Sequence, residues 1–497
     1  MRLSKSSFLI LIIVLIGFFV RFYKITSSPE GLYIDETSIG YNAYSIISTG
    51  RDEHGSFMPL FFEAFGEYKL PVYIYLVALV QSVIGPSDLS VRIPSLVFGT
   101  LSIPLIYLFS GEIFRNFREL HIKSMVGILA GFLFAVSPWH FQFSRPGFEA
   151  SVGLFLLILG LYLFLKGVNK SSKLNISLSF IFFVMTLYSY NSARIVTPLV
   201  LLLLFLMYLR NFDLKSWVKM AIPALILAIP FLGFSLSPEG FARARQVSVF
   251  FQDGTAADIL SNYSKNISPL YLFKEGDPTF NHLTIYRMSL LYLVEVPFFF
   301  FGLTYLILAR FKNFLLIVAL FFIALIPPAL ATLNPHALRG MLVLSATPII
   351  TAFGFGYFLF SFKSIYLRRI MSILFVIVIL ASTLSFLDTY HGKYAPTSGW
   401  DWQVGIKRAS LRALELEGNY NDIYFDVDPR LIPVLWYLKI DPGQYQKAIN
   451  KSRLGKFHIN DTIFSTHGLY IGSKSMGTLI NYVYYPDGKI AYGIWEF

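Results

Sequence analysis

Residues 8–20 read FLILIIVLIGFFV, a run of apolar side chains without a single charge. Runs of the same kind recur at 199–209 and 371–380. Repeated apolar runs predict helices that cross a lipid bilayer. The composition agrees, because 55% of the 497 residues are hydrophobic and 14% are charged, whereas about a quarter of a soluble domain is charged. The sequence therefore predicts a polytopic membrane protein and excludes a soluble enzyme, a disordered chain and a fibrous repeat.

The apolar stretches predict the number of membrane crossings. Eleven stretches are expected to span, near 8–25, 92–111, 123–138, 149–167, 176–192, 195–210, 218–236, 288–309, 312–331, 340–361 and 369–387. No small-residue cleavage site follows the first stretch, so we expect it to remain as an anchor. An odd number of spans leaves the amino terminus in the cytoplasm and the carboxyl terminus outside.

One further apolar segment, 70–85, is expected not to cross. With eleven spans, most Lys and Arg residues fall in the inner loops, and the short outer loops hold one arginine each. A crossing at 70–85 would reverse every later loop and violate the positive-inside rule. We therefore expect this segment to lie in the membrane interface or to re-enter from outside. The net charge of +12 then marks cytoplasmic loops rather than a nucleic-acid partner.

Three long pieces face outward in this arrangement, at 26–91, 237–287 and 388–497. The last piece contains strand-like runs at 421–427, 469–471 and 490–495, and a helical pattern at 412–417. The predicted fold is an all-α membrane bundle over residues 1–390, followed by a small extracytoplasmic α/β domain at 391–497. The chain has no Cys, which excludes disulfides and thiolate metal sites.

Acidic residues are frequent in the first outer piece. Asp35 and Glu36 open a stretch whose apolar residues recur at helical spacing. Asp35 is either the N-cap of that helix or a carboxylate held at the membrane surface as a general base. Glu149 stands at the outer mouth of another span, where it either belongs to a site or interacts favourably with the helix dipole. The residues by themselves leave both alternatives open in each case.

Cationic side chains gather at the predicted outer ends of the spans. They are Lys69, Arg145, Arg194, His336 and Arg339. Such residues either extend to lipid headgroups or form a pocket for a phosphate, which arginine binds in bidentate fashion. Tyr188 precedes Arg194 in an aromatic and polar run. It can stack on a sugar or belong to an aromatic belt at the membrane interface.

Motifs of several enzyme classes are missing from the sequence. It contains no Walker A loop, no G-x-G-x-x-G and no H-E-x-x-H. The histidines are dispersed along the chain, so no metal site is indicated. These features argue against a nucleotide-driven pump and against a zinc protease.

The order of the short motifs resembles that of a known family. The stretches concerned are Asp35-Glu36, Tyr68-Lys69-Leu70-Pro71, Ser90-Val-Arg92-Ile-Pro-Ser95, Ser137-Pro-Trp-His140, Ser144-Arg145-Pro-Gly-Phe-Glu149, Tyr188-Ser-Tyr-Asn-Ser-Ala-Arg194, Gly276-Asp-Pro278 and Pro335-His-Ala-Leu-Arg339. Over about residues 1–390 the chain resembles the GT-C membrane glycosyltransferases of the protein O-mannosyltransferase and aminoarabinose transferase type. Each motif is short, and their order and membrane placement make the resemblance specific.

The resemblance implies transfer of one sugar from a polyprenyl-phosphate donor to a hydroxyl group of a lipid, glycan or protein acceptor. It implies inversion at the anomeric carbon, the extracytoplasmic face of a bacterial plasma membrane as the place of reaction, and no metal or other cofactor. The family's general base corresponds to Asp35, and Glu36 and Glu149 correspond to the neighbouring and the second outer acid. Lys69 corresponds to the basic residue that faces the donor phosphate, and the charge pattern adds the other cations.

Some residues depart from the family pattern. Leu70 stands where relatives often have Pro, and the tail has Trp400-Asp-Trp402 in place of a Trp-Trp-Asp run, which disfavours an oligosaccharyltransferase. The piece 237–287 is too short for the extra sugar-recognition domain of eukaryotic protein mannosyltransferases, so a protein acceptor stays open. A lipid-linked sugar flippase is the main alternative, and a non-catalytic receptor or scaffold is a third. Transporters often contain paired repeats and broken helices at the membrane midplane, whereas these polar residues gather at outer span ends.

Overall fold

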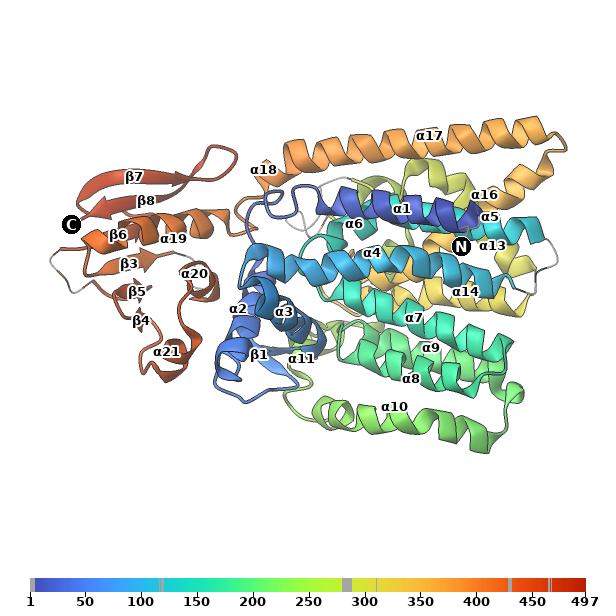
Figure 1. The fold of residues 1–497 in the computed structure, drawn as a ribbon, viewed down its shortest axis with the longest axis horizontal. Coiled ribbons are helices and arrows are strands. Elements are labelled where there is room, and N and C mark those ends of the chain that lie inside the picture. The colour runs from blue at the N-terminus through green and yellow to red at the C-terminus, as the bar shows by residue number, and fades with distance from the viewer. Residues whose placement is uncertain are drawn as a thin grey trace. The chain divides into compact units, whose positions relative to one another are not determined.

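A computed structural model describes residues 5–115, 117, 120–278, 288–309, 311–427, 431–463, 465 and 467–497. The chain forms two compact units, whose elements are labelled in Figure 1. The helical unit comprises Met1–Tyr23, Phe65–Val72 and Ser95–Phe386. The sheet unit comprises Lys24–Ala64, Tyr73–Pro94 and Leu387–Phe497.

The helical unit consists almost entirely of apolar helices. In chain order they are α1 (Lys5–Phe22), α4 (Asp88–Ile113), α5 (Leu120–Val136), α6 (Pro138–Ser144), α7 (Ala150–Asn169), α8 (Lys173–Leu187), α9 (Ala193–Tyr208), α10 (Leu214–Ser235), α11 (Ala242–Val247), α12 (Ala256–Ile267), α13 (Val296–Leu308), α14 (Lys312–Ala324), α15 (Ile326–Ala329), α16 (Thr347–Ser361) and α17 (Ile365–Thr389). The first turns of α4 and the last residues of α17 belong to the sheet unit. A helix bonds all of its backbone polar groups internally, which a hydrocarbon environment requires.

The helices account for every predicted membrane span. Among the described residues, eight helices are long and apolar enough to cross a membrane, and α5 with α6, bent by 55°, makes a ninth. Two shorter apolar helices, Lys173–Leu187 and Leu293–Leu308, lie at the two remaining predicted spans. The segment 70–85 forms α3 (Pro71–Ile84), a helix of 14 residues. Because α8 has 15 residues, length does not separate the two, and the interfacial position of α3 stays a prediction.

Glycines set how closely two helices of the bundle approach. α13 packs against α16, and the contact is made at Gly302 and Gly354. A Cβ atom on Gly354 would lie 1.9 Å from the carbonyl oxygen of Phe298, and one on Gly302 would lie 2.3 Å from that of Ile350. No residue with a side chain permits this approach without a backbone shift, and small residues are common at such membrane-helix contacts.

A mixed sheet organises the carboxyl-terminal part of the sheet unit. Its strands are β3 (Ile423–Asp426), β4 (Arg453–Leu454), β5 (Phe457–Ile459), β6 (Leu469–Gly472), β7 (Thr478–Tyr484) and β8 (Ile490–Glu496), in the spatial order β4-β5-β3-β6-β8-β7. The strand β3 is parallel to β5 and β6, whereas β8 is antiparallel to β6 and β7. Ile423, Phe425, Ile471 and Ile494 are buried and form the core of the sheet.

Short elements from the two ends of the sequence complete the fold. They are α2 (Ile34–Thr49), β1 (Phe62–Ala64), β2 (Glu67–Lys69), α18 (Ala395–Thr397), α19 (Val404–Leu416), α20 (Leu431–Tyr437) and α21 (Pro442–Lys447). All except β2 belong to the sheet unit, in which α2 packs against α20 and α21. The amino-terminal helix that carries Asp35 is therefore part of the same compact unit as the carboxyl-terminal sheet.

The α/β character predicted for the tail is confirmed. The strands β3, β6 and β8 lie at the three predicted runs, whereas β4, β5 and β7 were not predicted. The boundary at residue 390 and the outward orientation of the tail stay predictions. Of the predicted outer piece 237–287, residues 279–287 lie outside the part of the chain that the structure describes.

Candidate active site

Asp35 lies in the first turn of α2, in the sheet unit. The helix begins at Ile34, and its N-cap residue is Tyr33. The alternative that Asp35 is the N-cap is therefore wrong. A carboxylate in the first turn is favoured by the helix dipole, and the side chain of Asp35 is partly exposed.

Glu36, by contrast, is a buried structural residue. Its carboxylate accepts hydrogen bonds from Arg92 Nε at 3.0 Å and Arg92 Nη2 at 3.2 Å, and from the Tyr33 backbone N–H at 2.9 Å. The Arg92 guanidinium also donates to three backbone carbonyls, those of Ile25, Pro29 and Gly31. This network ties residues 25–33 and the first turn of α2, which contains Asp35, to the start of α4.

The loop 334–340, in the helical unit, is held through its backbone. Trp139 Nε1 donates to the carbonyl of Ala337 at 2.9 Å, and the Ala337 N–H donates to the Asp277 carboxylate at 2.6 Å. The Tyr190 hydroxyl donates to the carbonyl of Leu338 at 2.5 Å. Both backbone polar groups of Ala337 are thus bound by side chains from other segments. The loop presents Arg339 from a fixed backbone.

Arg339 is a half-buried cation with spare hydrogen-bonding capacity. Its Nη1 atom is buried and finds no hydrogen-bond partner among the described residues. Burial, and next the positive charge of Arg243, lowers the pKa of Arg339 to about 10. The side chain is therefore still charged at neutral pH, and a buried charge of this kind is stabilised by an anionic partner.

Two further arginines belong to the same electrostatic cluster. Arg243 on α11 lies 2.5 Å from both carboxylate oxygens of Glu67. Arg194 on α9 interacts electrostatically with both of these residues. Its guanidinium stacks on two aromatic rings of α10, and its buried Nε has no hydrogen-bond partner among the described residues. Arg194, Arg243 and Arg339 are called the arginine cluster below.

Glu149 joins this cluster through Tyr190. The electrostatic neighbours of the Tyr190 hydroxyl are Glu149, Arg339 and Arg243. Glu149 occupies the N-cap position of α7 without a capping hydrogen bond from its side chain. The structure therefore brings together three of the predicted site residues, Glu149, Arg194 and Arg339, with Arg243 and Glu67.

Arg145 and Tyr188, two predicted site residues, have structural contacts. Arg145 Nη1 donates to the carbonyls of Val20, Arg21 and Tyr23 at 3.2, 2.8 and 2.7 Å, which caps the carboxyl-terminal end of α1. The Tyr188 hydroxyl accepts from the Phe231 N–H at 2.9 Å and donates to the Leu227 carbonyl at 2.8 Å, which completes the ladder of α10. Roles in phosphate binding and sugar stacking stay predictions.

Lys69 and His336, two further predicted site residues, also lie in the helical unit. Lys69 ends β2, and its Nζ lies 5.4 Å from the ring centre of Phe65. His336 is buried in the loop that carries Arg339. Among the described residues, no group of three His, Asp or Glu side chains is arranged to hold a metal ion.

Comparison with solved structures identifies the fold of the chain. The oligosaccharyltransferase AglB from Archaeoglobus fulgidus, in complex with an inhibitory peptide and a dolichol-phosphate, superposes with a TM-score of 0.58 at 13% identity, over 87% of this chain and 63% of that chain. ArnT from Cupriavidus metallidurans, bound to undecaprenyl phosphate, superposes with a TM-score of 0.57 at 12% identity, over 99% of this chain and 98% of that chain. The chain has the GT-C fold.

A sequence-family model also matches part of this GT-C protein. Residues 69–234 match the family described as dolichyl-phosphate-mannose-protein mannosyltransferase. No curated protein matches it by sequence. The chain spans 63% of the length of the archaeal oligosaccharyltransferase. More than a third of that protein therefore has no counterpart in the superposition with this chain.

Several residues of this GT-C protein carry contacts that sequence reasoning did not find. Arg243 lies in an outer piece without a recognisable motif, and its partner Glu67 is 176 residues away. Tyr190 was not singled out from the aromatic and polar run that begins at Tyr188. For Arg92 the sequence did contain a signal. An arginine at the start of an apolar span requires a partner, and the acidic pair Asp35-Glu36 lies in the preceding outer piece.

Proposed function

We propose that this protein is a membrane glycosyltransferase, which moves one sugar from a polyprenyl-phosphate donor to an acceptor hydroxyl at the extracytoplasmic face. Two solved structures of similar fold contain a dolichol-phosphate and an undecaprenyl phosphate. The matched family is described by a dolichyl-phosphate-mannose donor. These likenesses support the donor class. The identity of the sugar and of the acceptor is left to experiment.

The observation that carries the proposal is the arginine cluster. Its Arg339 Nη1 and Arg194 Nε atoms are buried and without hydrogen-bond partners among the described residues, whereas Arg243 is paired with Glu67. A phosphate group supplies the anionic oxygens that such donors prefer. When the bond between the anomeric carbon and the phosphate oxygen breaks, the electron pair stays on the phosphate. Cations placed there stabilise the charge that develops in the transition state.

Asp35 is assigned the proton transfer. As the acceptor oxygen bonds to the anomeric carbon, its proton passes to the Asp35 carboxylate, which is ordinary general-base catalysis. Glu36 and Arg92 act as positioning residues, because they hold the first turn of α2 and do not themselves present a group to substrate.

Donor turnover by purified protein in lipid tests the assignment of the base. A panel of polyprenyl-phosphate sugars is offered to wild type, Asp35→Asn and the control Glu63→Gln, which removes an exposed carboxylate of the same first outer piece. We expect one donor to be consumed by wild type and by the control, and at least a hundredfold slower by Asp35→Asn. Equal turnover by wild type and Asp35→Asn would show that Asp35 is not the base.

The arginine cluster is tested separately through donor binding. Arg339→Gln should raise the KM for the donor, whereas Arg245→Gln should leave it unchanged, because Arg245 is an exposed arginine on α11. Loss of a charged hydrogen bond of about 1.5–3 kcal/mol corresponds to roughly a 10- to 150-fold change. An unchanged KM for Arg339→Gln contradicts the phosphate assignment without affecting that of Asp35.

A further inference from the structure

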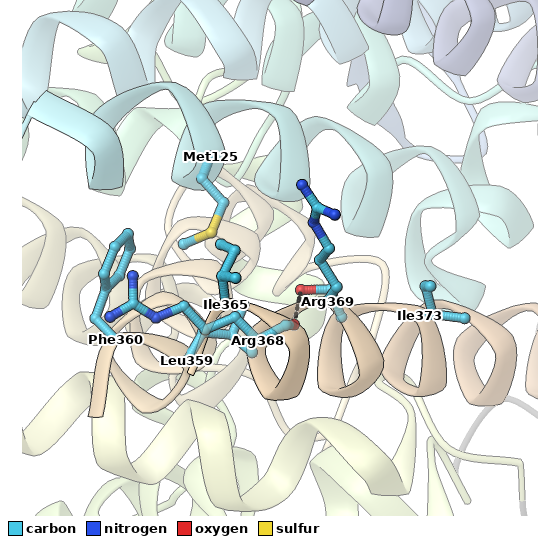
Figure 2. Close-up of a pocket in the computed structure, with 8 residues that line it drawn as sticks. Met125, Leu359, Phe360, Ile365, Arg368, Arg369 and Ile373 are labelled. Atoms are coloured by element: carbon cyan, nitrogen blue, oxygen red, sulfur yellow. Dashed lines mark hydrogen bonds between the residues drawn. The ribbon is translucent and has the colours of Figure 1, made fainter. Parts of the chain in front are cut away.

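The helical unit contains a pocket that is lined by none of the residues of the arginine cluster. It has a volume of about 570 Å³ and is lined by Met125, Leu359, Phe360, Ile365, Arg368, Arg369, Ser372 and Ile373. These residues come from the first turns of α5, the last turn of α16 and the first turns of α17. In Figure 2, Met125 extends towards α17, and Arg369 extends from α17 to the same side. The pocket is thus a crevice between three membrane helices at one of their ends.

The pocket lies at the opposite end of α16 from Arg339. Arg339 precedes the short turn Met341–Ser345 and the start of α16 at Thr347, whereas Leu359 and Phe360 lie in the last turn of that helix. A helix of 15 residues is about 22 Å long. The two sites are therefore separated by most of a bilayer thickness, and the pocket is not part of the candidate active site.

The charge of the pocket is positive and uncompensated by its own helices. Arg368 and Arg369 lie in the first turns of α17. The sequences 120–136 and 347–361 contain no Asp or Glu, and the only acid of α17 is Asp388, about 28 Å along the helix from Arg369. Arg369 is exposed, and its side chain makes no hydrogen bond or ion pair within the described part of the chain. Arg368 donates through Nε to the carbonyl of Phe362 at 2.8 Å.

Apart from Ser372, whose hydroxyl donates to the Arg368 carbonyl at 2.8 Å, the rest of the lining is apolar and continues into a lipid-facing surface. Ile365 and Ile373 are more than half exposed, as are Leu384 and Ile377 further along α17. A peripheral membrane helix presents such side chains to acyl chains. The pocket therefore combines a cationic end, at the position expected for headgroups, with an apolar wall that leads into the hydrocarbon layer.

We propose that this pocket binds one anionic phospholipid, with the phosphate of its headgroup at Arg368 and Arg369 and the start of its acyl chains along Met125, Ile365 and Ile373. The volume is within the range of small-molecule sites, about 300–1,000 Å³. The lipid acts as a structural ligand, because it fills the crevice between α5, α16 and α17 and neutralises two adjacent cations. The inference does not depend on the proposed function.

Native mass spectrometry of the detergent-purified protein tests this proposal. Phosphatidylglycerol is added to the protein, and phosphatidylcholine of the same acyl chains is the comparison. We expect tighter binding of phosphatidylglycerol, and a loss of about fivefold for each arginine removed in Arg369→Gln and Arg368→Gln/Arg369→Gln. Arg210→Gln removes an exposed arginine at the end of α9 and should leave the affinity unchanged. Arg369→Lys should recover part of it.

A second variant addresses the apolar wall. Met125→Trp fills the crevice without altering any charge, and it should weaken phosphatidylglycerol binding while inorganic phosphate has no effect on the complex. Equal binding of the two lipids, unchanged binding in both arginine variants, or displacement of the lipid by millimolar inorganic phosphate would each overturn the proposal. The last of these results would identify a site for a free anion instead.

Discussion

The buried pair of Glu36 and Arg92 makes a quantitative prediction about the sheet unit. Arg92→Met removes five hydrogen bonds, two to the carboxylate and three to backbone carbonyls, and leaves a fully buried carboxylate without its counter-charge. Removing one partner of a buried ion pair costs about 3–5 kcal/mol. In a unit of this size, 1 kcal/mol shifts the melting temperature by about 2–4 °C. The expected decrease is therefore about 6–20 °C.

Tryptophan fluorescence during heating is a suitable assay, because four of the six tryptophans lie in the sheet unit. Arg408→Met is the matched control. Arg408 also pairs with a glutamate of the first outer piece, Glu30, but both side chains are about one-third exposed. Exposed pairs contribute about 0–1 kcal/mol, so the control should melt within a few degrees of wild type.

The double variant Glu36→Gln/Arg92→Met separates the two causes of the loss. If the penalty comes from an uncompensated buried charge, the double variant should be more stable than Arg92→Met alone. The reasoning is refuted if Arg92→Met melts no lower than Arg408→Met. In that case the five hydrogen bonds do not hold the start of α2, and another explanation is needed for the position of Asp35.

Three further predictions concern the helical unit, each checked by thermal unfolding in detergent. Gly354→Ala should destabilise the protein by about 1–3 kcal/mol, because the added Cβ meets the backbone at Phe298. Gly111→Ala is the control, since nothing lies within 4 Å of its added Cβ, and it should be neutral or slightly stabilising. Equal stability of the two variants would contradict the contact between α13 and α16. Tyr188→Phe should cost about 1–3 kcal/mol, because a buried N–H and carbonyl of α10 lose their partner. If Tyr188→Phe has normal stability but has lost activity, the result would support the predicted role of Tyr188 in sugar stacking instead. Arg145→Gln should lower the stability of the protein by about 1–2 kcal/mol, because the end of α1 loses its cap, and it should leave the donor KM unchanged. A raised KM at unchanged stability would instead support the predicted phosphate role of Arg145.

The membrane fold was largely predictable, because apolar runs have a direct physical meaning. Each of the eleven predicted spans corresponds to a helix or a bent pair, including the short α8. The strands β3 and β8 were predicted from β-branched and aromatic runs between turns. β7 was missed because most of its residues are exposed and show no apolar alternation. β4 and β5 have two and three residues, too few for any pattern.

The sequence indicated which charged residues were candidates for the site, but it did not indicate which residues they contact. The position of Asp35 next to a helix start followed from the sequence, whereas the cap at Tyr33 did not. The reason is that Glu36 binds the Tyr33 N–H and leaves Asp35 inside the helix. The phosphate role of Arg145 stays a prediction, and nothing in the sequence indicated that its guanidinium also caps a helix more than a hundred positions earlier. Pairings of this kind depend on tertiary structure, which a single sequence does not encode locally.

The way in which the loop 334–340 is held has a consequence for how related sequences should vary. Trp139, Asp277 and Tyr190 bind backbone atoms of Ala337 and Leu338, and the peptide groups are the same whatever side chains these two positions carry. Substitution at Leu338, which is partly exposed, is therefore compatible with an unchanged position of Arg339. If the position of Arg339 is under selection, that selection acts on Trp139, Asp277 and Tyr190, which lie in distant parts of the sequence. In related sequences these three residues should therefore change together or not at all.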